Sequence, residues 1–155
     1  LNGLTTISGM EISGNASLVN LVGLDSVTSI QGMGTTISDN IALTSLAGLN
    51  AVTSIGGSLG LNSNPVLANL SALNQVSSVG YLSIINNDAL ISLSGLGNIN
   101  YNTITGLTIQ NSELLSICDV QSICDYLDIP TNPATISGNA IGCSTRMEVE
   151  TECGN

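Results

Sequence analysis

The sequence predicts an all-β-dominated repeat protein, built as a right-handed parallel β-solenoid with short helices in a C-terminal cap. Three observations support this prediction. A motif recurs about every 24 residues, the apolar residues are almost all aliphatic, and the four cysteines all lie after residue 117. We expect a single structural domain, with the repeats in residues 1–112 and the cap in residues 113–155.

The composition limits the kind of core that the chain can build. Of its 155 residues, 43% are hydrophobic, yet only 2% are aromatic, with three Tyr and no Phe or Trp. The core must therefore consist of Leu, Ile and Val. Stacked repeat units have narrow interiors that aliphatic side chains can fill, so this composition favours a repeat architecture.

Asparagine marks one position of the repeat, and Ser112 replaces it once. Asn tolerates the geometry of tight turns, and its amide can bond backbone groups of a neighbouring unit. We therefore interpret the column as a structural ladder. Its members are Asn15, Asn40, Asn64, Asn87 and Asn139.

After each of these positions, an apolar residue recurs at every third place. In the second unit these residues are Leu43, Leu46, Leu49, Val52 and Ile55. A period of three is neither that of an α-helix nor that of a flat strand. We expect a tight ribbon that touches the core every third residue. The same alignment sets Leu1, Leu4 and Ile7 at the end of a unit, so we expect the chain to start in mid-repeat.

Each unit then changes to strict alternation, which is typical of a short strand. Stacked units would join these strands into a parallel sheet, and "ATIS" near the C-terminus adds one more strand through Ile136. Thr35 is the one polar residue among the inward positions, and we expect Met33 to fill the space beside it. The two inward columns are Met10, Thr35, Leu59, Leu82, Leu107 and Ile12, Ile37, Leu61, Ile84, Ile109.

The residues between these inward positions point outward and form the candidate ligand face. They are small, mostly polar and nearly uncharged, and the Asn and Gln side chains could hydrogen-bond a partner. The two outward columns are Glu11, Thr36, Gly60, Ser83, Thr108, Thr135 and Ser13, Ser38, Asn62, Ile85, Gln110, Ser137.

Two units quoted in full show a family pattern: "NIALTSLAGLNAVTSIGGSLGLNSN" and "NPVLANLSALNQVSSVGYLSIINN". They follow L-x-x-L-x-x-L-x-x-V, then I-G-G, then L-x-I-x-x-N. This pattern resembles leucine-rich repeats, more specifically the receptor L-domain type, over residues 1 to about 112. The resemblance implies a repeat fold and an extracellular binding or adhesion module.

The C-terminal segment has a resemblance of its own. "ICDVQSICDYL" followed by "ISGNAIGCSTRMEVETEC" is similar to the segment that closes repeat regions in secreted surface proteins of Flavobacteria and their relatives. In those proteins a sorting domain of the type IX secretion pathway often follows. The resemblance implies a secreted or cell-surface protein and a structural role for the cap.

Helical spacing within the cap predicts two helices. Ile117, Val120, Ile123, Cys124 and Leu127 have helical spacing, and Pro130 ends the run. Thr145 and Glu148 form a possible capping box for a last helix that runs to Cys153.

The four cysteines allow three interpretations. A zinc site is disfavoured because no C-x2-C or C-x4-C motif is present. A reactive thiol lacks a His to activate it. We therefore expect two disulfides, formed in an oxidising compartment. Bridges between the two helices would pair Cys118 with Cys143 and Cys124 with Cys153, and the swapped pairing remains open.

The charge excludes several functions. Eleven residues are acidic, Arg146 is the one basic residue, and there is no His, giving a net charge of −10. This charge repels phosphate backbones and anionic lipids, so we expect no nucleic-acid binding and no direct membrane insertion. Only carboxylates could act as acid or base, and they are scattered along the chain. We expect no enzymatic activity and no cofactor.

Turn carboxylates raise the question of a calcium site. Asp39 and Asp88 lie beside the ladder positions, and oxygen ligands suit Ca²⁺. No EF-hand or G-G-x-G-x-D repeat is present, and turn geometry explains both residues. We therefore expect no metal site. Asp39 and Asp88 are the candidate ligands for a calcium ion if one binds.

These observations predict an extracellular, non-catalytic module that binds a protein or glycan partner through the candidate ligand face. One alternative is ice binding, because ranks of Thr and Ser on a flat β-solenoid resemble the surface of ice-binding proteins. A second alternative is a structural spacer in a larger surface protein. The sequence does not determine the oligomeric state.

Overall fold

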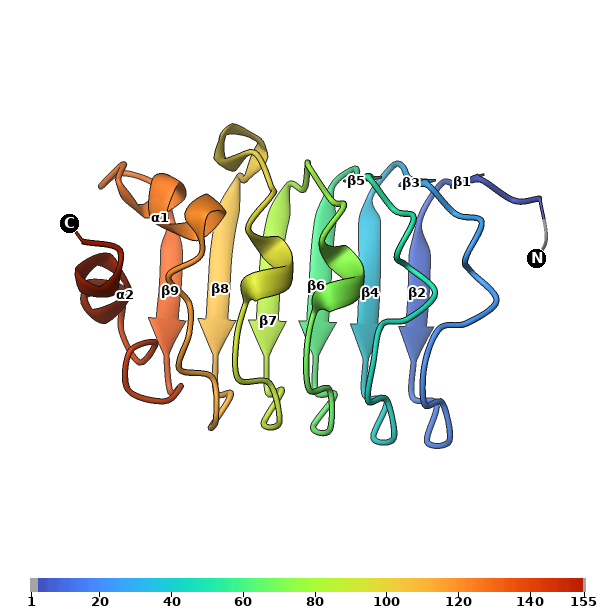
Figure 1. Ribbon diagram of the computed structural model, residues 1–155, viewed down its shortest axis with the longest axis horizontal. Coiled ribbons are helices and arrows are strands. Elements are labelled where there is room, and N and C mark those ends of the chain that lie inside the picture. Colours follow the sequence, from blue (N-terminus) through green and yellow to red (C-terminus); the bar gives the residue numbers. More distant parts are fainter. Residues whose placement is uncertain (1–2, 155) are drawn as a thin grey trace.

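The computed structural model describes residues 3–154, and Leu1, which the sequence sets at the end of a unit, lies outside them. The fold is rich in parallel β structure. Its main element is a six-stranded sheet with the strand order β2-β4-β6-β7-β8-β9 (Figure 1). The strands are Met10–Ser13 (β2), Gly34–Ser38 (β4), Ser58–Asn62 (β6), Tyr81–Ile85 (β7), Gly106–Gln110 (β8) and Ala134–Ser137 (β9).

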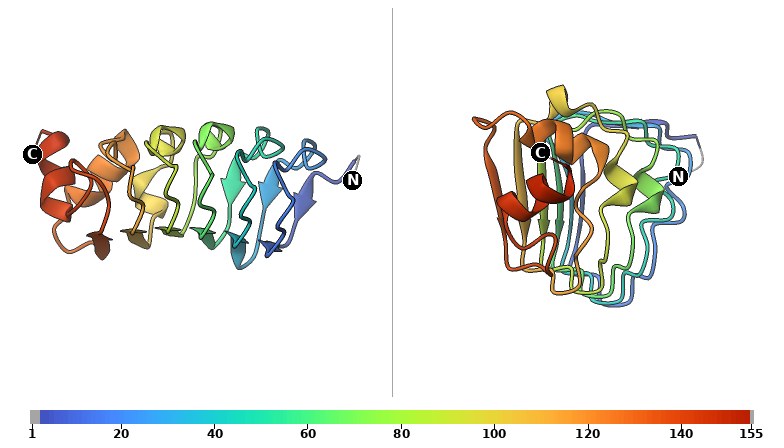
Figure 2. Two further views of the ribbon diagram at one scale, coloured as in Figure 1. Left: turned by 90° about the horizontal axis from the view of Figure 1, so that it is seen from below. Right: turned by 60° about the vertical axis from the view of Figure 1, so that its left-hand side comes forward.

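Smaller elements complete each unit. A second, three-stranded sheet joins two-residue strands in the order β1-β3-β5. The short helices η1 and η2 lie across the molecule from the six-stranded sheet (Figures 1 and 2). These elements are Thr6–Ile7 (β1), Ser29–Ile30 (β3), Ser54–Ile55 (β5), and the 3-10 helices Ser71–Leu73 (η1), Ser94–Leu96 (η2) and Tyr101–Thr103 (η3).

Successive repeat units lie side by side along the long axis, and the two termini lie at opposite ends (Figure 2). Every neighbouring pair in the six-stranded sheet is parallel, and its register is one repeat unit: Ile12 pairs with Ile37, and Ile37 with Leu61. The inward columns therefore have the order predicted from the sequence. Ala134 and Ile136 of β9 extend them by one strand.

The segments with an apolar residue at every third position run as consecutive tight turns. The backbone N–H groups of Leu43, Leu49 and Val52 each donate to the carbonyl three residues earlier. Some of these turns continue into the 3-10 helices η1 and η2, which were not predicted. A 3-10 helix has three residues per turn, so it satisfies the same spacing as the expected ribbon. Both conformations direct the aliphatic side chains into the core, where they are buried.

One inward position is a packing defect. Thr35 is 1% exposed, and its Oγ1 has no hydrogen-bond partner within residues 3–154. The expectation that Met33 fills the adjacent space is wrong, because its side chain is 93% exposed. Met33 lies between Gly32 and Gly34, which have φ of 72° and 108°, in the sharp turn before β4. That turn leaves Met33 in solvent.

The substitution Thr35→Val should therefore stabilise the protein by about 1 kcal/mol. Valine keeps the shape of the side chain and removes a buried hydroxyl that would otherwise lose about 1–3 kcal/mol of hydration. Urea denaturation measures the change. Thr36→Val, the next residue on the solvent side of β4, serves as the control and should change stability by less than about 0.5 kcal/mol. Equal effects at both positions would contradict the explanation.

The asparagine ladder joins neighbouring units with a fixed direction. The side-chain oxygen Oδ1 of Asn64 accepts from the backbone N–H of Asn40 (3.2 Å) and from the side-chain amide of Asn40 (3.2 Å). The Asn64 amide donates to the carbonyl of Ile37 (2.9 Å) in the preceding unit. Asn40 and Asn87 make equivalent bonds, and all three side chains are fully buried. Each of these three amides thus binds the unit before it.

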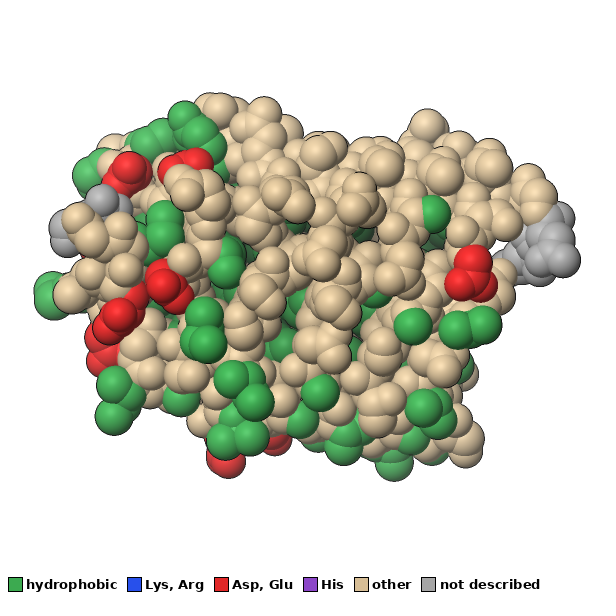
Figure 3. Space-filling view, viewed as in Figure 1, with side chains coloured by type: hydrophobic (Ala, Val, Ile, Leu, Met, Phe, Trp, Pro, Cys, Tyr) green, Lys and Arg blue, Asp and Glu red, His purple; other side chains and the backbone are tan. Residues whose placement is uncertain are grey.

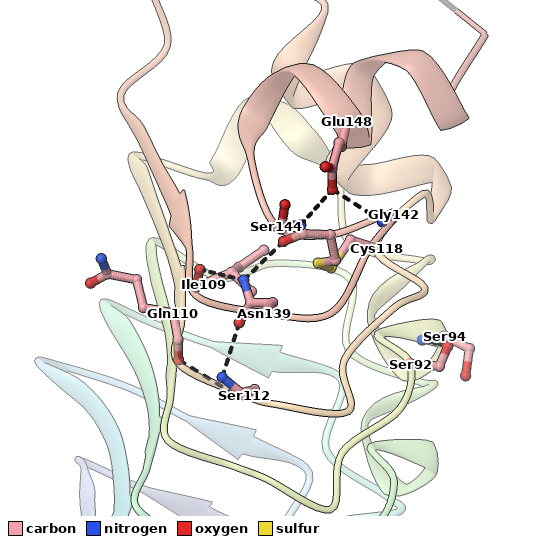
Figure 4. The surroundings of a disulfide bond; sticks show 11 residues. Ser92, Ser94, Ile109, Gln110, Ser112, Cys118, Asn139, Gly142, Ser144 and Glu148 are labelled. Atoms are coloured by element: carbon pink, nitrogen blue, oxygen red, sulfur yellow. Dashed lines mark hydrogen bonds between the residues drawn. A yellow bond between two sulfur atoms is a disulfide. The ribbon is translucent and has the colours of Figure 1, made fainter.

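Ser112 fills only half of this role. Its hydroxyl accepts from the backbone N–H of Asn87 (3.1 Å), as a ladder amide would. Its donor bond goes to Gln110 within its own unit (3.4 Å). Asn139 resumes the full pattern, accepting from Ser112 and donating to the carbonyl of Ile109 (Figure 4).

The geometry of the turn before each ladder residue explains why an aspartate occurs at position 39, one of the calcium candidates. The residue before the ladder position has a left-handed conformation in successive units, with φ of 57° at Asp39 and 55° at both Ser63 and Asn86. Asp and Asn adopt this conformation more readily than other side-chain-bearing residues. Asp39 therefore occupies its position for backbone reasons.

Two α-helices and two disulfides cover the C-terminal end. The helices are Gln121–Leu127 (α1) and Arg146–Glu152 (α2). The disulfides pair Cys118 with Cys143 and Cys124 with Cys153, which is the pairing favoured from the sequence. Cys118 and Cys143 are completely buried. Two disulfides indicate an oxidising environment.

The start of the first helix differs from the prediction. Ile117 is 46% exposed and lies outside α1, where it forms a bridge to Ser92 of the preceding unit. Leu115 and Cys118 instead continue the three-residue spacing of the repeat, and both are fully buried. Cys118 therefore takes the place of a core leucine, and its disulfide begins in the last apolar layer of the repeat.

The capping box at the start of α2 is also different in detail. Thr145 accepts from the backbone N–H of Glu148, as predicted. The Glu148 carboxylate, however, accepts from the backbone N–H groups of Ser144 (2.9 Å) and Gly142 (3.1 Å) (Figure 4). These bonds, with that of Ser144 the largest contribution, lower the pKa of Glu148. The carboxylate thus holds the segment from Gly142 to Ser144, on either side of Cys143.

Arg146 holds the two helices of the cap together. Its guanidinium donates to the backbone carbonyls of Asn132 (2.9 Å) and Leu127 (2.9 Å) and forms an ion pair with Glu150 (2.6 Å). Nearby, the Tyr126 hydroxyl donates to the carbonyl of Pro133 (2.9 Å). Burial raises the pKa of Tyr126, although the adjacent Arg146 acts in the opposite direction. The one basic residue therefore has a structural role.

Within the residues that the structure describes, the N-terminal end is not covered in the same way. β2 is the edge strand of the sheet within residues 3–154, and Ile12, Leu18 and Leu24 are only partly buried. Their counterparts in the next unit are fully buried. These side chains line a hollow at this end of the described chain.

Candidate ligand face

The sheet registers bring the predicted ligand-face residues together. Glu11 pairs with Thr36, Thr36 with Gly60, and Gly60 with Ser83. The first column continues through Thr108 to Thr135. The second column is formed by Ser13, Ser38, Asn62, Ile85, Gln110 and Ser137 in the same manner. Adjacent side chains in a column are therefore separated by the spacing of strands, about 4.8 Å.

Hydrogen bonds between face residues fix several of these side chains. The Ser83 hydroxyl donates to Asn62 Oδ1 (3.1 Å), and Gln110 Nε2 donates to Ser137 Oγ (2.8 Å). Gly60 lies beside Asn62, where an added Cβ would approach Asn62 Nδ2 at 3.3 Å. The centre of the face is thus a shallow, preorganised polar surface with one position that lacks a side chain.

The face carries almost no charge. Within its two columns Glu11, on β2, is the one ionisable residue, and the positions from β4 to β9 are hydroxyl, amide, glycine or isoleucine residues. The other acidic residues of the protein lie elsewhere, with several side chains over the C-terminal cap (Figure 3). Electrostatics on the face therefore attract neither anions nor cations strongly.

The sequence prediction missed Tyr81, the first residue of β7. Tyr81 pairs with Gly106 of β8 and is 44% exposed on the outer side of the sheet. It belongs to a third outward column, two residues before Ser83, in which the other units have Gly34, Ser58 and Gly106. Because the rest of that column is glycine and serine, with Pro133 beside Gly106, the repeat alone does not mark it. The alternation within "YLSII" does mark it.

The calcium candidates do not form a cluster. Asp39 precedes its ladder residue and Asp88 follows its own, so they occupy different positions in their turns. In the part of the chain that the structure describes, no three His, Cys, Asp or Glu residues lie close enough to hold a metal ion. The structure gives no support to a calcium site at these residues.

A separate apolar strip lies along the turns that follow the strands. Figure 3 shows hydrophobic side chains along this lower edge of the molecule. The exposed apolar residues in these turns are Val19, Ile41, Val66, Ile91, Leu114 and Ile141. The strip is distinct from the candidate ligand face, because these residues come after the strands and not from them.

Comparison with protein-family models, with curated proteins and with solved structures finds no match to this chain. No helix within residues 3–154 has the length and apolarity needed to cross a bilayer. The function must therefore be inferred from the residues of the face themselves.

Proposed function

We propose that this protein is a secreted or cell-surface, non-catalytic binding module, with a right-handed β-solenoid of the leucine-rich-repeat type as its scaffold. The parallel register of one unit per strand and the leucine spacing support the scaffold. The disulfides support export. The partner is a protein or glycan on a cell or matrix surface.

One observation carries the proposal for the ligand. The polar outward columns of six strands lie in register on one rigid surface, while ionisable groups are nearly absent from it. A rigid surface loses little conformational entropy on binding, which favours recognition of an external partner. The face has one carboxylate, Glu11, and no basic side chain that could act as its partner in acid–base chemistry, which favours binding over catalysis.

A binding screen against glycans and matrix proteins tests the proposal, with variants that block the face. Thr36→Arg and Ser83→Arg each place a long charged side chain in the first outward column, and we expect at least a tenfold loss of affinity. Ala68→Arg introduces the same residue at an exposed position outside the strands, and should leave binding unchanged. Equal losses in all three variants would contradict binding through this face.

Ice binding is the second candidate, favoured by the regular Thr and Ser positions and the lack of charge on the face. Ile85 and Tyr81 interrupt that regularity, because both are larger than their neighbours. Thermal hysteresis with shaped ice crystals would support this function. If neither hysteresis nor a partner is found, a spacer role gains support.

A further inference from the structure

The ring of Tyr81 lies flat on the sheet in a defined position. An added Cβ on Gly106 would approach Tyr81 Cε2 at 2.7 Å and Cδ2 at 2.8 Å, so the ring rests directly on the glycine. The Tyr81 hydroxyl shares a hydrogen bond of 2.6 Å with Thr108 Oγ1 in the same neighbouring strand. Contacts at both the ring and the hydroxyl hold the side chain across β8, and 44% of it remains exposed.

Polar side chains of the same face lie on the strand that this ring crosses and on the neighbouring strands. Ser83 follows two residues later on β7, and Thr135 lies beyond Thr108 on β9. Asn62 and Gln110 belong to the second column beside them. The ring therefore forms an aromatic platform next to hydroxyl and amide groups that can both donate and accept hydrogen bonds.

We propose that the ligand of this face is an uncharged saccharide, which packs the C–H side of a sugar ring on Tyr81 and hydrogen-bonds to the polar groups beside it. The inference rests on the proposed function and specifies its ligand. A sugar ring combines an apolar side with a rim of hydroxyls. A fixed aromatic ring beside neutral hydrogen-bonding groups is complementary to both parts.

Charge and composition favour this ligand over the others. The net charge of −10, with one arginine engaged in the cap, disfavours acidic polysaccharides. The core of a protein interface is typically more apolar than this surface, on which the apolar side chains are Tyr81, Ile85 and the exposed Pro133 beside Gly106. The surface is thus polar and uncharged with a single stacking group, which fits a neutral oligosaccharide.

The test is a glycan array with neutral β-glucans, xylans, galactans and chitooligosaccharides alongside alginate and heparin, followed by calorimetry on a bound neutral glycan. We expect binding to neutral members. Tyr81→Ala should weaken it at least twentyfold, and Tyr81→Phe, which keeps the ring and loses the Thr108 bond, about two- to fivefold. Gly106→Ala keeps residue 81 a tyrosine but displaces its ring from the sheet, because the added methyl would lie too close to the ring, and it should weaken binding at least fivefold.

Tyr101→Phe is the matched control, since Tyr101 lies in η3, outside the strands, and this change should leave affinity unaltered. Circular dichroism establishes that each variant is folded. The inference is overturned if no neutral saccharide binds at millimolar concentration, or if Tyr81→Ala binds like the unaltered protein. If a protein partner is lost with Ser83→Arg while every saccharide fails, the saccharide inference is overturned and the proposed function stands.

Discussion

Replacing Asn64 with alanine should destabilise the protein by about 3 kcal/mol. The change leaves the buried backbone N–H of Asn40 unpaired and removes one of the hydrogen bonds that the carbonyl of Ile37 accepts. Each unpaired buried group costs about 1–3 kcal/mol, and the missing side-chain atoms leave a small cavity. Urea denaturation of the purified variant measures the loss.

The variant Asn64→Ser sharpens the explanation. A serine hydroxyl can accept from Asn40, as Ser112 accepts from Asn87, but it does not replace the donor to Ile37. We therefore expect about half the loss of the alanine variant. The exposed Asn74 provides the control, and Asn74→Ala should change stability by less than about 0.5 kcal/mol. Equal losses of stability in Asn64→Ala and Asn64→Ser would contradict the explanation that the ladder amide stabilises the protein both as acceptor and as donor.

The second large effect is expected at the buried disulfide. The double variant Cys118→Ala, Cys143→Ala opens a cross-link between residues separated by 25 positions. Loop entropy predicts a loss of about 3.5 kcal/mol, to which the removal of two fully buried sulfurs adds. Thermal and urea unfolding measure the total, and hydrogen exchange should show the first loss of protection in β9 and α2, which this bridge holds in place.

The other disulfide is the natural comparison. Cys124 and Cys153 are separated by 29 positions, so the entropic loss on opening it is nearly the same. Cys124 and Cys153 are only partly buried, however, so the packing loss is smaller. We expect Cys124→Ala, Cys153→Ala to be the milder double variant. The opposite order would show that the buried bridge is not the main attachment of the cap.

The sheet register could be predicted from the sequence because two periods coincide in it. Alternation of two residues sets which side chains face inward, and the repeat of about 24 residues aligns one strand with the next. Ile12, Ile37 and Leu61 illustrate this agreement. A one-residue slip would have exposed the whole inward column, so the hydrophobic pattern alone determines the pairing.

Other features could not be predicted because one pattern fits two structures. A spacing of three residues describes both a ribbon of turns and a 3-10 helix, so η1 and η2 were missed. Residues from Ile117 to Leu127 fit a helix, yet the first of them continue the repeat. The position of Met33 depended on the glycines around it and not on its own apolar character.

The platform at Tyr81 shows a different limit. Its exposure follows from alternation, but the position of its ring depends on Gly106 and Thr108, which lie 25 and 27 residues further along the chain. A residue without a side chain in the next strand makes space for the ring. Such a relation between a large and a small residue becomes visible only once the register is known.

The placement of Arg146 has a consequence for proteolysis. Proteases of trypsin specificity cleave after lysine or arginine, and in this sequence Arg146 offers them their one target. Its guanidinium is bound to backbone carbonyls of the cap, which hinders entry into a protease pocket. A cut there would still release no fragment with Cys153, because the disulfide to Cys124 retains it. The repeats themselves contain no site for such enzymes even when unfolded, which would prolong the life of the protein where such proteases are present.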